Sequence, residues 1–246
     1  MIRSKGLLIA VGVISLIVGL ILNLPARVAI HWMAPSEIAI GGIEGTVWNG
    51  SARELLVRGI YLREVNWSLS TMQALVGKFT YDVEANPISG FFESELQIKS
   101  NGEIVMSELR ATLPVSLLSS AIGINELQGQ SNLIFDRLEL VNGFPIVADG
   151  TVNIIDLVIP LVGRDLLGDY EIEFFTQSNS VSASVIDNNG LIDFAGSLQI
   201  RNDRSFEFIG LIIPGPETPA AIRRQLQFLP PANDKGQQEL RLEGIL

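Results

Sequence analysis

A two-residue alternation of apolar and polar side chains restricts the fold of this chain more than any other feature. The alternation runs through FFESELQIK (91–99), LIDFAGSLQIR (191–201) and SFEFIG (205–210). Successive side chains of a β-strand point to opposite faces of the sheet, so this period predicts strands with one apolar and one polar face. The chain is therefore expected to be mainly β.

Turn-forming pairs separate the alternating runs, namely Asn-Gly at 101–102, 142–143 and 189–190, and Asn-Asp at 202–203. Such residues tolerate the positive φ that tight hairpins require. Segments bounded by proline, glycine or capping residues predict short helices within 69–77, 113–123 and 215–231. We therefore expect a curved, largely antiparallel β-sheet domain with a few short helices.

An uncharged apolar run from Gly6 to Leu22 precedes the alternating region. Extended to Leu24, it would span roughly 28 Å as a helix, close to the thickness of the hydrocarbon core of a bilayer. Arg3 and Lys5 precede the run, and basic residues favour the cytoplasmic side. We predict a cytoplasmic N-terminus at 1–5, one transmembrane helix at 6–24, and a β-rich domain at 25–246 on the far side of the membrane.

A cleaved signal peptide is the alternative interpretation of the same run. Signal peptides have a shorter apolar core and end in a small-x-small cleavage site. The sequence NLPARVAIHW (23–32) offers no good site of that kind, which favours a retained helix.

Composition argues against several classes of function. The formal net charge of −10 argues against a nucleic-acid partner, because phosphate contacts need clustered lysine and arginine. The absence of cysteine excludes thiolate zinc sites and a cysteine nucleophile. The single histidine, His31, lies beside Trp32 after the apolar run and is interpreted as an interfacial residue. We predict no metal site, no cofactor and no catalytic residue; a hidden cluster of carboxylates is the enzymatic alternative.

The hexamer GTVWNG (45–50) is a candidate ligand loop, but it lacks the Gly-Lys-Ser/Thr ending of a phosphate loop. Gly45 and Gly50 are expected to permit turns or bulges at the two ends of a short strand. Trp48 would then reach one face of the sheet, with Trp67 packed beside it if the first strands form a hairpin. A core corner is favoured over an aromatic that binds a partner.

Three motifs follow one another: Leu-Pro-Ala at 24–26, GTVWNG at 45–50, and VNWSL at 65–69. Their order resembles protein N of the bacterial type II (general) secretion pathway, which has a Leu-Pro-Ala exit, a Gly-Thr-hydrophobic-Trp-x-Gly motif and a hydrophobic-x-Trp motif. The matching positions are Leu24, Pro25, Ala26, Gly45, Thr46, Trp48, Gly50 and Trp67. The chain departs from the pattern at Asn153, where a further tryptophan is expected.

The resemblance implies a non-catalytic accessory subunit of the bacterial inner membrane, with its main domain in the periplasm and no cofactor. Its partners would be the lipid bilayer, through one helix, and other inner-membrane components of an apparatus that exports folded proteins across the outer membrane. The alternative is a membrane-anchored module in the periplasm that binds lipid or another apolar ligand in a groove of the sheet. Five phenylalanines would line that groove: Phe92, Phe174, Phe194, Phe206 and Phe208.

Overall fold

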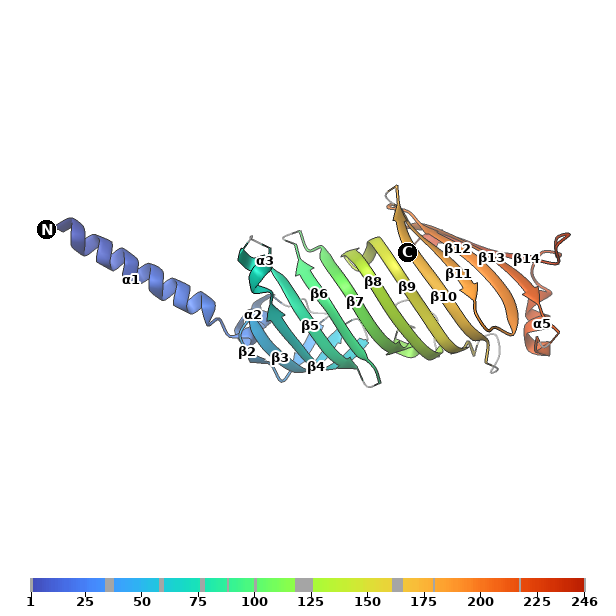
Figure 1. The fold of residues 1–246 in the computed structure, drawn as a ribbon, viewed down its shortest axis with the longest axis horizontal. Coiled ribbons are helices and arrows are strands. Elements are labelled where there is room, and N and C mark those ends of the chain that lie inside the picture. The colour runs from blue at the N-terminus through green and yellow to red at the C-terminus, as the bar shows by residue number, and fades with distance from the viewer. Residues whose placement is uncertain are drawn as a thin grey trace.

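The computed structural model describes residues 2–33, 38–57, 60–75, 78–87, 89–99, 101–117, 126–160, 166–178, 180–216 and 218–245. These residues form one 14-stranded sheet with helices at its ends (Figure 1). The helices are α1 (Ile2–Leu22), α2 (Ala26–Met33), α3 (Thr71–Leu75) and α5 (Ala220–Leu226). The strands are β1 (Ile38–Gly41), β2 (Glu44–Gly45), β3 (Asn49–Val57), β4 (Ile60–Leu69), β5 (Thr80–Pro87), β6 (Phe91–Ile98), β7 (Ile104–Pro114), β8 (Gln128–Val141), β9 (Phe144–Val158), β10 (Gly168–Gln177), β11 (Ser180–Asp187), β12 (Ile192–Ile200), β13 (Ser205–Pro214) and β14 (Gln238–Ile245).

The sheet is an open antiparallel meander. Its order is β1-β3-β4-β5 and onward to β14 in sequence, and β2 pairs with β3 beside this path. The predicted hairpin at 142–143 is confirmed, because Asn142 and Gly143 have φ of 53° and 77° and join β8 to β9. Positive φ at both central residues matches the right-handed twist of the flanking strands. The prediction of a mainly β, largely antiparallel domain is therefore confirmed.

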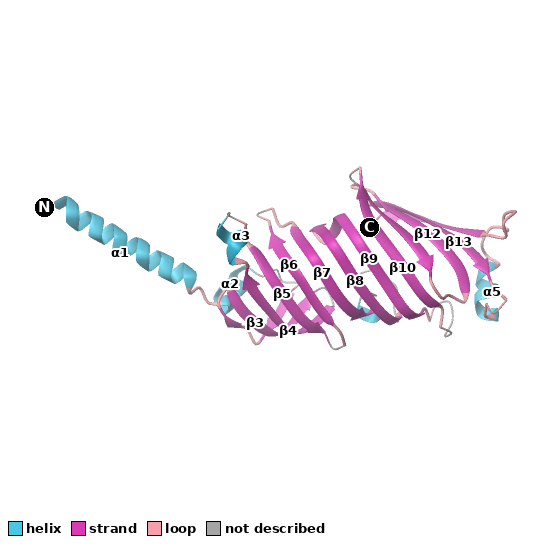
Figure 2. Cartoon of the chain, viewed as in Figure 1, coloured by secondary structure: helices cyan, strands magenta, loops and turns pink. Residues whose placement is uncertain are grey.

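The sheet is strongly curved. In Figure 2 strands β5 to β10 face the viewer, whereas β12 and β13 turn away from them. Glu64, Glu108 and Asp156 have positive φ of 50°, 50° and 56°, and the pairing register shifts beside each of them. An extra residue in one strand bends it and increases its twist, so these bulges contribute to the curvature.

One face of the sheet carries the core. Pairing places Ile200 opposite Phe206, Leu198 opposite Phe208 and Val181 opposite Ile200, so the apolar residues of neighbouring strands lie on one side. Val181 is only 2% exposed although the sheet has a single layer, because curvature brings apolar side chains of neighbouring strands together. The main cluster comprises Leu109, Ala111, Leu113, Phe135, Ala148, Val152, Val181 and Ile200.

A second cluster lies where α5 covers the end of this apolar face. Ile222 and Leu226 of α5 pack with Leu167, Tyr170 and Ile212. Burial raises the pKa of the Tyr170 phenol to about 12, with the Asp187 carboxylate as a smaller cause. This packing fixes α5 against strands β10 and β13.

The short helices agree in part with expectation. The predictions within 69–77 and 215–231 are confirmed by α3 and α5, and Pro219 precedes α5 with φ of −58°. The prediction within 113–123 meets a helical turn at 115–117, and 118–123 lie outside the described residues. Helix α2 was not predicted.

Among the described residues, no helix combines the length and the apolar character that a membrane crossing requires.

Candidate functional site

The hexamer GTVWNG is a tight turn rather than a strand. Glu44 pairs with Ser51 and Gly45 with Gly50, so 46–48 connect β2 to β3. The Thr46 amide donates to the Asn49 carbonyl at 2.8 Å, and the Asn49 amide donates to the Thr46 hydroxyl at 3.1 Å. The predicted short strand is therefore wrong, because these local hydrogen bonds close a turn instead.

Both glycines of the hexamer are required by close approach of the backbone. Gly45 has φ of +83°, a conformation that side chains other than glycine seldom adopt. A Cβ atom on Gly50 would lie 2.6 Å from the Glu44 carbonyl oxygen and 2.6 Å from the Trp67 ring. The prediction that Gly45 and Gly50 permit a turn is therefore correct, but the short strand that was expected between them does not form.

Trp67 supports this turn from the neighbouring strand. The predicted hairpin of the first strands exists as β3 and β4, and it places Trp67 opposite Gly50. The Trp67 indole N–H donates to the carbonyls of Thr46 and Val47, each at 3.2 Å. Trp67 therefore packs against the turn, whereas Trp48 pairs with Phe79 at a ring separation of 6.4 Å.

Trp48 connects the turn to the end of α1. Its indole N–H donates to the Ile21 carbonyl at 2.8 Å, and the Val47 amide donates to the Leu24 carbonyl at 3.0 Å. Pro25 forms an antiparallel bridge with Thr46. The Ile21 carbonyl also accepts from the Leu24 amide at 3.2 Å, so the Trp48 indole adds a second hydrogen bond at the end of α1. We call this set, Ile21, Leu24, Pro25, Ala26 and residues 45–50 with Trp67, the helix–sheet junction.

Helix α2 begins at the junction and packs its small side chains against the sheet. The amides of Val28 and Ala29 donate to the Pro25 carbonyl, and Ala26 and Ala29 are 0% and 7% exposed. Trp32, near the end of the helix, is 77% exposed. Pro25, directly before Ala26, could have indicated the start of this helix from the sequence, since proline is favoured at helix starts.

The eight residues singled out from the sequence motifs all meet in the helix–sheet junction. Trp48 bonds to a residue 27 positions away, whereas Thr46 and Gly50 shape the turn that holds it. Ile21 could not be identified from the sequence, because it accepts the hydrogen bond through its backbone carbonyl, which every residue type has. The junction therefore attaches the C-terminal end of α1 to the first strands of the sheet by hydrogen bonds.

The five groove phenylalanines lie on the apolar face of the sheet but spread from β6 to β13. Phe92, Phe174 and Phe206 pack against the main cluster, and Phe194 packs against the second. The Phe194 and Phe208 rings stack at 6.3 Å. Their packing accounts for them as core residues, and ligand binding by them stays a prediction.

A polar hollow lies beside the junction on the other face of the sheet. Its volume is about 400 Å³. Its lining is rich in hydrogen-bonding groups and carboxylates, comprising Glu44, Gly45, Asn49, Gly50, Ser51, Asn66, Trp67, Ser68, Asp82 and Glu84. Because the charged side chains in that lining are all acidic, the hollow disfavours anionic ligands.

Several carboxylates hold structural hydrogen bonds. Asp169 accepts from the Asp156 amide at 3.0 Å, and Glu171 accepts from the Asn188 side chain at 3.4 Å. Glu103 and Glu139 are 9% and 4% exposed and share ion pairs with Lys99. Within the described ranges, no group of three or more His, Asp or Glu is arranged to hold a metal ion.

Comparison with known proteins supplies the family. The family described as "Type II secretion system (T2SS), protein N" matches residues 36–241. Two proteins called type II secretion system protein N are similar along nearly their whole length. The one from Vibrio cholerae serotype O1 is 22% identical, covering 94% of this chain and 94% of its own length. The one from Aeromonas hydrophila is 22% identical, covering 98% of this chain and 99% of its own length.

No solved structure matches the chain significantly. The family match covers most of the sheet, including GTVWNG and the Trp67 motif. The chain therefore belongs to the protein N family of the type II secretion system.

Proposed function

We propose that this protein is a non-catalytic accessory subunit of the type II secretion apparatus, held in the inner membrane by one transmembrane helix at 6–24. Residues 1–5 would lie in the cytoplasm and 25–246 in the periplasm. The sheet would then act through contact with other inner-membrane components of the apparatus rather than through bond-making chemistry. The uncharged sequence from Gly6 to Leu22, preceded by Arg3 and Lys5, supports this topology.

The helix–sheet junction is the observation that carries the proposal. A subunit that works by contact needs its partner surface held at a fixed direction from the membrane. The bond from Trp48 to Ile21, the bond from Val47 to Leu24 and the bridge from Pro25 to Thr46 supply that constraint within a few residues of the helix end.

The surface around the junction also fits the edge of a bilayer. Trp32 is 77% and Phe79 is 53% exposed, and Arg27 and Lys78 are exposed near them in the sequence. Aromatic rings and basic side chains are the residues that favour the interface between hydrocarbon and water.

Membrane topology is tested by single cysteines, because the natural chain has none. In intact spheroplasts, a membrane-impermeant maleimide should label Glu93→Cys and leave Ser4→Cys unlabelled until the cells are lysed. The cysteine-free chain is the control. Labelling of Ser4→Cys before lysis, or protection of Glu93→Cys, would reverse the proposed orientation.

Partnership is tested by affinity purification of the tagged full chain from membranes of a strain that has the apparatus. Inner-membrane components of the apparatus should copurify with the natural chain, and less with Trp48→Ala, because that variant loosens the junction. Trp32→Ala is the matched tryptophan control. If no component of the apparatus copurifies under conditions that preserve the membrane complex, the proposed function is refuted.

A further inference from the structure

Strand β14 leaves one long edge of the sheet open. It pairs with β13 through eight consecutive positions, from Ser205 opposite Ile245 to Ile212 opposite Gln238, without a register shift. On its other side, no strand of the described part of the chain is hydrogen-bonded to it. The outward N–H and C=O groups of such an edge form a ready template for another strand.

This edge has only one of the features with which proteins usually protect an edge strand. Short length, charged side chains, proline and bulges are the common protections, and β14 has only the charged side chains Glu239, Arg241 and Glu243. Strand β1, at the opposite end of the sheet, is only four residues long. Strand β14 has eight residues, reads QELRLEGI, and leaves Leu242 50% and Ile245 80% exposed.

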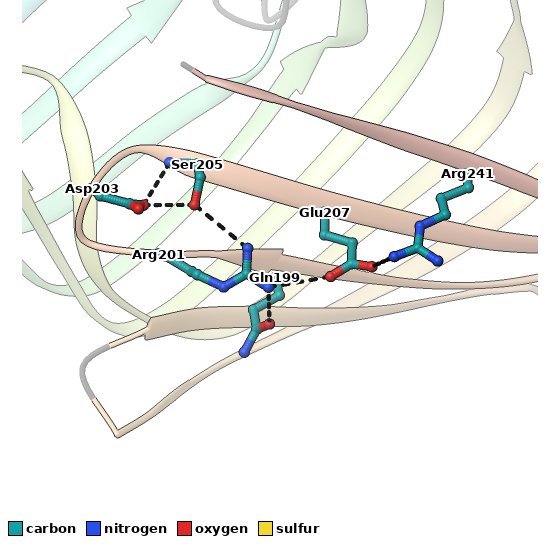
Figure 3. Close-up of polar contacts among 6 residues, drawn as sticks. All are labelled: Gln199, Arg201, Asp203, Ser205, Glu207 and Arg241. Atoms are coloured by element: carbon teal, nitrogen blue, oxygen red, sulfur yellow. Dashed lines mark hydrogen bonds and ion pairs between the residues drawn. The ribbon is translucent and has the colours of Figure 1, made fainter.

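The polar face of this edge carries unequal charge. Glu207 of β13 accepts from Arg201 at 3.2 Å and from Arg241 at 2.5 Å (Figure 3). Glu243 lies directly opposite Glu207, and like charges in that position repel. Among the described residues, no basic side chain forms an ion pair with Glu243. A basic side chain on an added strand would supply the missing partner.

We propose that β14 binds a β-strand of another protein, added to the sheet edge. The strand recognised would alternate apolar and charged residues, with basic side chains opposite Glu239 and Glu243 and an acidic one opposite Arg241. Its apolar residues would lie beside Leu240 and Leu242 and extend the apolar face of the sheet. Main-chain hydrogen bonds would give affinity and the alternating side chains specificity.

The position of β14 favours a different protein over a second copy. Helix α1 joins the sheet beside β2 and β3, and β14 is at the other end of the strand order (Figure 1). Antiparallel pairing of two β14 strands would direct the two α1 helices away from each other. Two helices that point away from each other could not enter the same membrane, whereas a strand of a different protein at β14 places no such demand on α1. The preference for a different protein over a second copy rests on the proposed membrane anchor, whereas the observation that the edge is open does not depend on it.

The test uses the full chain in nanodiscs and blocked peptides with a palindromic centre, so that strand direction does not matter. A peptide with the centre Lys-Leu-Glu-Leu-Lys should bind about tenfold more tightly than one with Glu-Leu-Lys-Leu-Glu, since three cross-strand charge pairs change sign. Fluorescence anisotropy measures both. The chain with Glu239→Lys, Arg241→Glu and Glu243→Lys should reverse the preference, with its Tm confirming that it folds.

Cysteine pairs locate the binding strand. Leu242→Cys should form a disulfide with a peptide carrying cysteine in place of a central leucine, whereas Ile40→Cys on β1 should not. Failure of both peptides to bind, or equal binding of both, would overturn the proposal. Efficient disulfide formation between two Leu242→Cys chains would show that a second copy occupies the edge and would also overturn it. Each of these results leaves the copurification test of the proposed function unaffected.

Discussion

Replacement of Trp48 by phenylalanine tests the helix–sheet junction most directly. The change keeps an aromatic ring near Phe79 but removes the N–H that donates to the Ile21 carbonyl at 2.8 Å. The net contribution of such a hydrogen bond is about 1 kcal/mol, because water competes for both groups. That value corresponds to roughly a fivefold rise in the ratio of open to closed junctions.

The expected change is partial. The Val47 amide still donates to Leu24, and Pro25 still pairs with Thr46, so the helix end stays attached while its direction varies more widely. Complete separation of α1 from the sheet would require loss of these backbone contacts as well. We therefore expect a broader range of helix directions without unfolding of the sheet.

Spin labels measure this range, because a chain without natural cysteine accepts a clean pair of labels. Labels at Val11→Cys in α1, where the side chain is 54% exposed, and at Glu93→Cys in β6 report the helix direction by double electron–electron resonance. Trp48→Phe should broaden the distance distribution, and Trp32→Phe should leave it unchanged. An unchanged distribution in Trp48→Phe, or equal broadening in the control, would refute the assignment of Trp48 as the link.

Three further outcomes are expected. Gly50→Ala should destabilise the domain by about 1–3 kcal/mol, because its Cβ meets backbone oxygen at 2.6 Å, whereas Gly41→Ala, with neighbours no closer than 3.6 Å, should change Tm little. Phe194→Ala should lower the free energy of unfolding in denaturant by about 2–3 kcal/mol, less than the loss of a fully buried ring. Native mass spectrometry of the β-rich domain at 25–246 should find no copurified lipid, and a bound lipid that is lost in the variant would favour the apolar groove. A hydrogen bond from Lys99 holds the pKa of Glu103 below its ordinary 4.5. The stabilisation by the ionised carboxylate is therefore lost in acid, and Tm should fall as the pH drops below 4.5. An equal fall of Tm in the Glu103→Gln chain would contradict this assignment to Glu103.

The strands were predictable because their pattern is local. Phe206 and Phe208 alternate with polar residues, and the same two-residue period places them on one face of β13 opposite Ile200 and Leu198. The Asn142-Gly143 turn was likewise visible, since its backbone conformation depends on those two residues. An antiparallel meander follows when each strand pairs with the next through a short turn.

The junction and the curvature were not predictable in the same way. The Trp48 indole donates to a backbone carbonyl, and residue types do not indicate which backbone carbonyl will accept a hydrogen bond from a given side chain. Glu64, Glu108 and Asp156 adopt positive φ although none is a glycine, so their bulges leave no residue-type pattern. Tertiary pairing imposes these conformations against local preference.

If β14 binds another strand as proposed, its distance from the junction makes the hydrogen bond of Trp48 important for that binding. The strand path from β1 to β14 contains 13 strands, and strands lie about 4.8 Å apart, so the sheet extends at most roughly 60 Å across its strands. Over that length, a swing of about 10° at the junction displaces the far edge by about 10 Å, twice the separation of paired strands. An edge that must pair with another strand in register therefore needs the direction of the sheet restrained near the helix. Trp48 lies at that position, where a small change of angle displaces β14 the most.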